Sequence, residues 1–118
     1  DPDNLAITLK LSNYYLSQND HEANLAILTT VNKAAVDPQV EWNLAQSYQA
    51  LEKFDAAAQA YENARPTYWE NLTFLKQLLG FYQENGDQAL LLDTLEHALT
   101  LAPDDPELTE LEAQYQAF

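Results

Sequence analysis

The side chains best suited to chemistry in this chain are two histidines and a run of carboxylates near its C-terminal end. His21 and His97 lie far apart in the sequence and form no ligand pair by their spacing. The H-E-x-x-H, P-loop and G-x-S-x-G patterns are all missing from the sequence. Because His21 lies between Asp20 and Glu22 at an expected helix start, we expect a solvated turn residue rather than a catalytic base.

The acidic run comprises Asp104, Asp105, Glu107, Glu110 and Glu112. General acid–base catalysis needs two carboxylates held in a shaped and partly dry cleft, which no pattern here predicts. The run also lacks the spacing and central glycine of an EF-hand calcium loop. Acidic side chains at a helix start interact favourably with the helix dipole, so we expect a solvated helix terminus. The sequence predicts no enzymatic activity, no metal site and no cofactor.

Charge and composition exclude several classes of partner. The 118 residues include 19 acidic and 5 basic side chains, which gives a formal net charge of −14. This charge repels nucleic acid and anionic membranes. We expect no membrane insertion, because no apolar run is long enough to span a bilayer, and no signal peptide is recognisable. The absence of cysteine excludes disulfides and thiol catalysis, but leaves the compartment open between the cytoplasm and a bacterial periplasm.

Helix starts and breaks can be predicted from local signals. Acid–proline pairs predict three starts, at Asp1-Pro2, Asp37-Pro38 and Asp105-Pro106. Thr67 and Glu70 form a capping-box pattern. Helix breaks are predicted at Asn19-Asp20, Glu52-Lys53 and Gly86-Asp87. Together these signals predict helices over 4–18, 21–35, 38–51, 55–65, 67–84, 88–101 and 106–117.

Three tyrosines recur at a nearly constant spacing. Tyr15, Tyr48 and Tyr82 are 33 and 34 residues apart, each a few residues before a predicted break. A period in this range, in a chain rich in helix formers, indicates stacked helical hairpins. Such hairpins cannot bury their apolar faces alone, so neighbouring hairpins share one core.

The residues around these tyrosines resemble the tetratricopeptide repeat, a family of helix-turn-helix units. The middle unit matches best, with large and small packing residues in order: Leu44, Ala45, Tyr48, Ala57, Tyr61 and Ala64. Asn24, Leu79 and Leu91 replace small residues in the other units, which predicts splayed or shifted hairpins there. The resemblance implies an all-α fold, a right-handed α-solenoid of about seven antiparallel helices. Its repeats would span approximately 5–37, 38–71 and 72–105, in a single domain.

The two ends of the chain differ. Residues 106–118 are predicted to form a C-terminal capping helix with a polar face. The opening helix is apolar on more than one side, with Leu5, Ile7, Leu9 and Leu11, and the chain begins with Asp1 rather than methionine. Our hypothesis is that the chain is a segment of a longer protein, with further repeats or domains upstream.

In the tetratricopeptide family the exposed side of each first helix lines a concave groove. Carried over residue by residue, the resemblance places there Ala6, Leu9, Lys10, Asn13, Leu16, Ser17, Gln39, Trp42, Asn43, Gln46, Gln49, Ala50, Thr73, Lys76, Gln77, Gly80, Gln83 and Glu84. The residues that we expect to contact a ligand are Leu9, Asn13, Leu16, Trp42, Asn43, Gln46, Gln49, Lys76, Gln77, Gly80 and Gln83. With two lysines and one glutamate, the predicted wall is rich in amides and nearly neutral.

Two groove positions have competing explanations. Trp42 would concentrate binding energy if it were exposed in the centre of the groove, but it could equally be a core tryptophan. Gly80 lies in mid-helix, where glycine costs about 1 kcal/mol relative to alanine. Either a ligand or a neighbouring helix requires that space, and we favour the neighbouring helix. The glutamines and asparagines could also be ordinary solvated helix residues.

Some members of the family hold the terminal carboxylate of a peptide with two asparagines and three basic residues. Asn13 and Asn43 match the two asparagines, but Leu9, Thr73 and Gln77 occupy the basic positions. A carboxylate bound there would lack its charge partners, so we expect this clamp to be absent.

The sequence thus favours a non-enzymatic protein–protein interaction module whose concave groove binds an extended peptide or a partner-protein segment. The amide side chains would hydrogen-bond to the ligand backbone. The alternative is a structural spacer within a larger bacterial assembly or biogenesis protein, for example in secretion, pilus formation or cytochrome maturation. In that case the acidic outer face or end-to-end packing would matter more than the groove.

Overall fold

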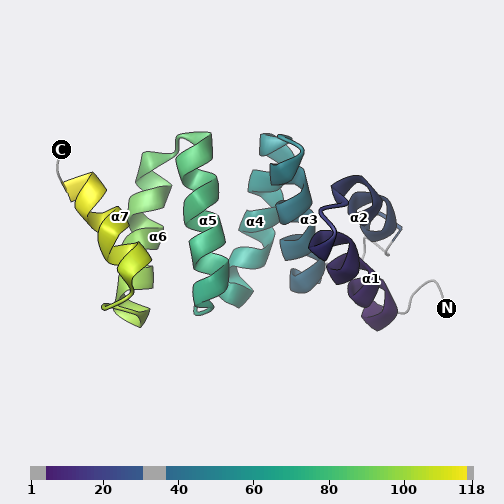
Figure 1. Cartoon of the computed structure of the whole chain (residues 1–118), viewed down its shortest axis with the longest axis horizontal. Coiled ribbons are helices and arrows are strands. Elements are labelled where there is room, and N and C mark those ends of the chain that lie inside the picture. The colour runs from purple at the N-terminus through teal and green to yellow at the C-terminus, as the bar shows by residue number, and fades with distance from the viewer. Residues whose placement is uncertain (1–4, 31–36, 117–118) are drawn as a thin grey trace. The chain divides into compact units, whose positions relative to one another are not determined.

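The computed structural model of the chain describes residues 5–30 and 37–116, and these residues form seven α-helices without a β-strand. The helices are α1 (Leu5–Ser17), α2 (His21–Leu28), α3 (Pro38–Ala50), α4 (Phe54–Tyr68), α5 (Leu72–Asn85), α6 (Gln88–Leu101) and α7 (Pro106–Gln116). The predicted all-α helical-repeat class is confirmed (Figure 1). None of the described helices is long and apolar enough to cross a membrane. The chain divides into two compact units, residues 1–66 and 67–118.

Three equivalent turns explain the spacing of the tyrosines. The carbonyl oxygens of Tyr15, Tyr48 and Tyr82 each accept a hydrogen bond from the backbone N–H five residues later, at 2.9, 2.8 and 3.1 Å. The turn before each donor contains a left-handed residue: Asn19 (φ 57°), Glu52 (φ 60°) or Gly86 (φ 79°). Such a bond from beyond the helix end satisfies a carbonyl that the helix leaves unpaired. The three predicted breaks are therefore confirmed.

Aspartates cap the helices that follow a break. Asp37 Oδ1 accepts the backbone N–H groups of Gln39 (2.8 Å) and Val40 (3.2 Å), directly before Pro38 in the first turn of α3. Asp105 does the same for α7. The short acidic side chain satisfies N–H groups that the first turn leaves unpaired. These two predicted starts are confirmed, whereas Asp1-Pro2 lies outside the described residues.

The predicted boundary between the fourth and fifth helices is wrong. Helix α4 continues through Pro66 to Tyr68, and α5 begins only at Leu72. Asn71, not Thr67, caps α5 by accepting the N–H of Phe74 at 3.0 Å. The proline suggested a boundary because it disfavours a helical residue before it, but Arg65 and Pro66 both remain within α4.

The predicted second helix, 21–35, also differs from the structure. Helix α2 ends at Leu28 with Thr29 at its C-cap. The Thr29 hydroxyl donates to the Ala26 carbonyl at 3.1 Å, and the Thr30 hydroxyl to the Ile27 carbonyl at 2.6 Å. Residues 31–36 lie outside the described part of the chain.

In the first unit, α1 packs on α2 and α2 packs on α3. Its core combines small and aromatic residues, including Ala45, Ala57, Tyr61 and Ala64, with four buried polar residues, Ser12, Asn24, Asn43 and Ser47. On α2, Asn24 replaces a small residue of the family pattern. It is fully buried there, and its side chain is hydrogen-bonded.

The second unit has a larger apolar core. Helices α5, α6 and α7 lie side by side in chain order (Figure 1). Buried leucines and aromatics dominate the interfaces: Phe74, Leu75, Leu78 and Leu79 on α5, Leu91 and Leu95 on α6, and Leu108 on α7. Because α5 and α7 both bury leucines in this core, their exposed faces, which carry the candidate site, are held in place.

Candidate functional site

Helices α5 and α7 of the second unit border an open pocket of about 310 Å³. Its lining comprises Lys76, Leu79, Gly80 and Gln83 on α5 and Glu107, Leu108, Glu110, Leu111 and Gln114 on α7. Leu79 and Leu108 are buried, whereas Gln83, Glu110 and Gln114 are exposed. The pocket therefore has an apolar floor and a polar rim.

Helical spacing places these residues on two facing stripes. Lys76, Gly80 and Gln83 recur at intervals of four and three residues, which is one face of α5. Glu107, Leu111 and Gln114 recur in the same way on α7. Both helices pack on the leucine-rich core of the second unit. The surface formed by these two stripes is therefore already folded before a ligand binds.

Gly80 keeps the α5 wall of the pocket open. A Cβ atom built at this position would meet no described atom within 4 Å. The neighbouring-helix explanation that we favoured from the sequence is therefore wrong for the described residues. A larger residue here would project into open space, so the missing side chain adds free volume to the pocket.

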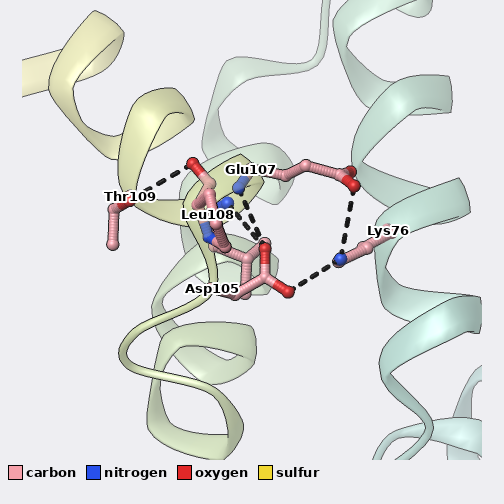
Figure 2. Close-up of polar contacts among 6 residues, drawn as sticks. Lys76, Asp105, Glu107, Leu108 and Thr109 are labelled. Atoms are coloured by element: carbon pink, nitrogen blue, oxygen red, sulfur yellow. Dashed lines mark hydrogen bonds and ion pairs between the residues drawn. The ribbon is translucent and has the colours of Figure 1, made fainter.

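An ion pair joins the two walls. Lys76 Nζ lies 2.8 Å from Asp105 Oδ2 and 3.5 Å from Glu107 Oε1 (Figure 2). The Asp105 side chain is only 15 % exposed and that of Lys76 28 %. The hydrogen bond from Lys76 lowers the pKa of the Asp105 carboxyl below 3.8, and the same bond raises the pKa of Lys76 above 10.5.

Three of the four predicted ligand-contacting residues on α5, namely Lys76, Gly80 and Gln83, line the pocket. The fourth, Gln77, is half-buried and lies outside the lining. Whether any of them contacts a ligand stays a prediction. The predicted nearly neutral wall did not include α7, which adds Glu107 and Glu110 to the lining of this pocket.

The α7 wall was missed from the sequence, although a signal was present. Tyr115 lies 33 residues after Tyr82 and so continues the tyrosine series. In this register α7 corresponds to the first helix of a further hairpin, the kind of helix that lines the groove in the family. The polar face of residues 106–118 had suggested only a capping helix.

In the first unit, the predicted ligand-contacting residues on α1 and α3 are mostly half-buried: Leu9, Leu16, Trp42, Gln46 and Gln49. Asn13 is exposed. The Gln49 side-chain oxygen accepts a hydrogen bond from the Tyr61 hydroxyl at 2.7 Å, and Gln46 Nε2 donates to the Trp42 carbonyl at 3.5 Å. Several of these amides are thus engaged within the protein.

Asn43 lies beneath the predicted wall rather than on it, since it is only 1 % exposed. Its Nδ2 donates to Ser12 Oγ at 2.8 Å and to Asn13 Oδ1 at 3.0 Å, while its Oδ1 accepts from Gln39 Nε2 at 2.9 Å. Both amide hydrogens are used within the unit. Asn43 has none left for the carboxylate of a peptide.

The polar network around Asn43 extends to a histidine. Ser12 Oγ donates to Asn24 Oδ1, and Asn24 Nδ2 donates to Ser47 Oγ at 2.7 Å and to the Asn43 carbonyl at 3.2 Å. Ser47 Oγ lies 2.9 Å from His21 Nδ1. His21 is therefore half-buried and hydrogen-bonded, so its interpretation as a solvated turn residue is wrong.

His97 likewise makes structural contacts. Its ring stacks on the Trp69 ring with centroids 4.4 Å apart and planes 6° apart, and its Nε2 lies 2.8 Å from the Trp69 carbonyl oxygen. Glu70 Oε1 lies 3.7 Å from the same nitrogen. In the described part of the chain, no three His, Asp or Glu residues are grouped so as to hold a metal ion.

Comparison with known proteins agrees with this architecture. Residues 38–105, more than half of the chain, match the family described as YpiA-like, C-terminal tetratricopeptide repeats. The chain belongs to this family. It is also 30 % identical over 97 residues to the TPR repeat-containing protein YpiA of Bacillus subtilis (strain 168). That alignment covers 81 % of this chain but only 23 % of YpiA, so the chain spans about a quarter of this relative.

Two solved structures share the fold. One is the type III secretion chaperone SycD of Yersinia enterocolitica in complex with a peptide of the translocator YopD, with a TM-score of 0.69 and 18 % identity. It matches over 98 % of this chain and 88 % of that chain. A second structure of the Yersinia enterocolitica type III secretion translocator chaperone SycD gives a TM-score of 0.67 at 18 % identity, over 99 % of this chain and 88 % of that chain. At this identity the likeness shows the fold alone.

The family match covers one of the two walls of the pocket. The matched segment contains α5 and ends at Asp105, the residue that pairs with Lys76. The α5 wall of the pocket thus lies inside the matched segment, and the α7 wall lies after it.

Proposed function

We propose that this chain is a non-enzymatic protein-interaction module that binds an extended peptide or a segment of a partner protein on the first helices of its hairpins. The observation that carries this proposal is the pocket between α5 and α7, which Gly80 keeps open. Its volume of about 310 Å³ is at the lower end of the range for ligand sites. This size suits one or two side chains of a longer ligand.

The chemistry of the lining fits a peptide. The buried Leu79 and Leu108 offer an apolar floor for a hydrophobic side chain. The exposed Gln83 and Gln114 offer both donors and acceptors to a peptide backbone. The helices are already folded and supported by their core, so little ordering energy would be lost on binding. SycD, a protein of the same fold, forms a complex with a peptide, which supports a peptide as the class of ligand.

The residues on α1 and α3 belong to the same proposal. In the first unit, Leu9, Leu16 and Trp42 would hold apolar side chains of a bound segment, while the exposed Asn13 would hydrogen-bond to the backbone of that segment. Asn43 would act indirectly by orienting Asn13 through their 3.0 Å hydrogen bond. Trp42→Ala combined with Gln46→Ala should weaken capture of a ligand if this part of the wall takes part.

The proposal can be tested by filling the pocket. Peptides are selected from a random display library on the wild-type protein, and their affinity is measured by fluorescence anisotropy. Gly80→Trp places an indole in the open space and should raise the Kd at least about tenfold, equivalent to about 1.4 kcal/mol. Ala89→Trp adds the same side chain at an exposed position of α6 outside the lining and serves as the matched control.

Two outcomes would contradict the proposal. One is that selection on the folded wild-type protein enriches no binding peptide. The other is that all selected peptides bind Gly80→Trp as tightly as they bind the wild type. Circular dichroism and thermal unfolding of both variants would show whether the fold is retained.

A structural spacer is the second candidate, and the exposed apolar side chains of α1 favour it. Ile7, Leu11 and Tyr14 are 56 %, 40 % and 58 % exposed and lie on one face of the helix. Such a face fits end-to-end packing on a further repeat. Sedimentation velocity would test this candidate: concentration-dependent association that Leu11→Lys abolishes would support it, and a monomer at every concentration would contradict it.

A further inference from the structure

We infer that the segment bound between α5 and α7 carries a lysine or arginine next to an apolar side chain. This inference rests on the proposed function, because it assigns the chemistry of a ligand to the same pocket. It reverses the charge preference of the carboxylate clamp described for other tetratricopeptide repeats, in which basic side chains hold an acidic group.

The charged side chains that line the pocket favour a basic ligand over an acidic one. The pocket lining contains two carboxylates, Glu107 and Glu110, and one cation, Lys76. Lys76 is already held by Asp105 at 2.8 Å and by Glu107 at 3.5 Å (Figure 2). Its charge is therefore offset within the protein, and an acidic ligand would compete with two carboxylates for it.

Glu110 provides the complementary group. It is exposed on the rim of the pocket, and in the described part of the chain no ion pair or hydrogen bond joins its side chain to another residue. A guanidinium or ammonium group that reaches this rim could form a charge-assisted hydrogen bond without breaking an existing contact.

The apolar floor adds the second requirement. Lysine and arginine bury their methylene stems along apolar surface while the charged head stays near water. Leu79, Leu108 and Leu111 supply such surface between the two helices, and the absence of a side chain at Gly80 leaves room for a stem. The same floor accommodates an adjacent apolar side chain of the ligand.

The wider charge distribution acts in the same direction. Residues 67–118 contain ten acidic side chains and one basic side chain, that of Lys76. Such a field raises the local concentration of cationic ligands and speeds their encounter. A second copy of this chain is a poor occupant, because it carries the same net charge of −14. The occupant is therefore a basic and partly apolar segment of another protein.

Charge exchange tests the inference. From the selected peptides that depend on Gly80, matched fluorescent pairs are made in which one lysine or arginine is replaced by glutamate. The wild type should bind the basic member about tenfold more tightly, the size expected for one hydrogen bond to a charged group. Glu110→Lys should abolish or reverse this preference. Glu96→Lys, at an exposed acid of α6 outside the lining, makes the same change in net charge and should leave the preference intact.

The outcomes separate the two proposals. If selected peptides depend on Gly80 but contain no excess of lysine or arginine, or if Glu110→Lys and Glu96→Lys have equal effects, this inference is overturned and the proposed function stands. If no selected peptide depends on Gly80, the proposed function fails. A preference for the basic peptide that weakens with added salt would further support the ion pair at the rim.

Discussion

Lys76 and Asp105 hold two helices of the second unit together through a single carboxylate. Asp105 Oδ2 pairs with Lys76 Nζ at 2.8 Å, whereas Asp105 Oδ1 accepts the backbone N–H groups of Glu107 at 3.0 Å and Leu108 at 3.2 Å. The residue that caps α7 therefore also ties α7 to α5 (Figure 2). These two helices form the walls of the pocket, so this contact helps to set the separation of the walls.

The stabilisation from this pair should depend on pH in a defined window. The pKa of Asp105 is lowered, so its contribution is present above pH 3.8 and is lost as the pH falls through the lowered pKa. The pKa of Lys76 is raised, so its contribution is present below pH 10.5 and is lost as the pH rises through the raised pKa. Lys76→Met should therefore destabilise the protein most between these limits, as measured by urea unfolding at a series of pH values.

Lys53→Met is the matched control for this series. Lys53 is exposed, and its replacement by methionine removes one positive charge from the first unit, just as Lys76→Met removes one from the second. Equal pH profiles for the two variants would show that the net charge, and not the contact with Asp105, determines the effect.

The buried amide of Asn24 should contribute strongly to the stability of the first unit. Asn24→Ala would remove three buried hydrogen bonds of this side chain, to Ser12, Ser47 and the Asn43 carbonyl. We expect a loss of about 2–3 kcal/mol in the free energy of unfolding, measured in urea. Asn63→Ala removes an exposed asparagine and should cost less than about 0.5 kcal/mol. Similar losses for both variants would contradict the network.

The two glycines should respond to alanine in opposite directions. Gly86 has φ 79°, a left-handed conformation in which a Cβ costs about 1–2 kcal/mol, so Gly86→Ala should destabilise the protein. Gly80 lies inside α5 with open space around it, so Gly80→Ala should stabilise the protein by up to about 1 kcal/mol. Thermal unfolding of both variants would measure this. A destabilised Gly80→Ala would mean that the space beside α5 is occupied.

Local signals predicted the helices well, because caps and turns depend on neighbouring residues. Asp37 and Gly86 have the roles that their types indicate. The boundary near Pro66 was wrong, because α4 continues past the proline to Tyr68 and Asn71 provides the cap for the next helix. The fold class followed from the spacing of the tyrosines, since their carbonyls close equivalent turns.

The site was harder to predict, because it depends on contacts between distant residues. Asn43 and Ser12 are 31 positions apart, and their hydrogen bond buries an asparagine that the family register placed on the surface. The pairing of Lys76 with Asp105 leaves no local pattern in the sequence. The acidic α7 wall could have been predicted from Tyr115, had the tyrosine series been continued to the end of the chain.

The most direct test of the account is to locate a bound peptide by NMR. Amide chemical shifts of the ¹⁵N-labelled protein would be followed while a selected peptide is added. We expect the largest changes at Lys76, Gly80 and Gln83 on α5 and at Glu110 and Gln114 on α7. Changes confined to other surfaces, with the α5 residues unaffected, would contradict this; one such surface is the hollow lined by Leu92, Leu95, Glu96, Leu99, Glu112 and Tyr115.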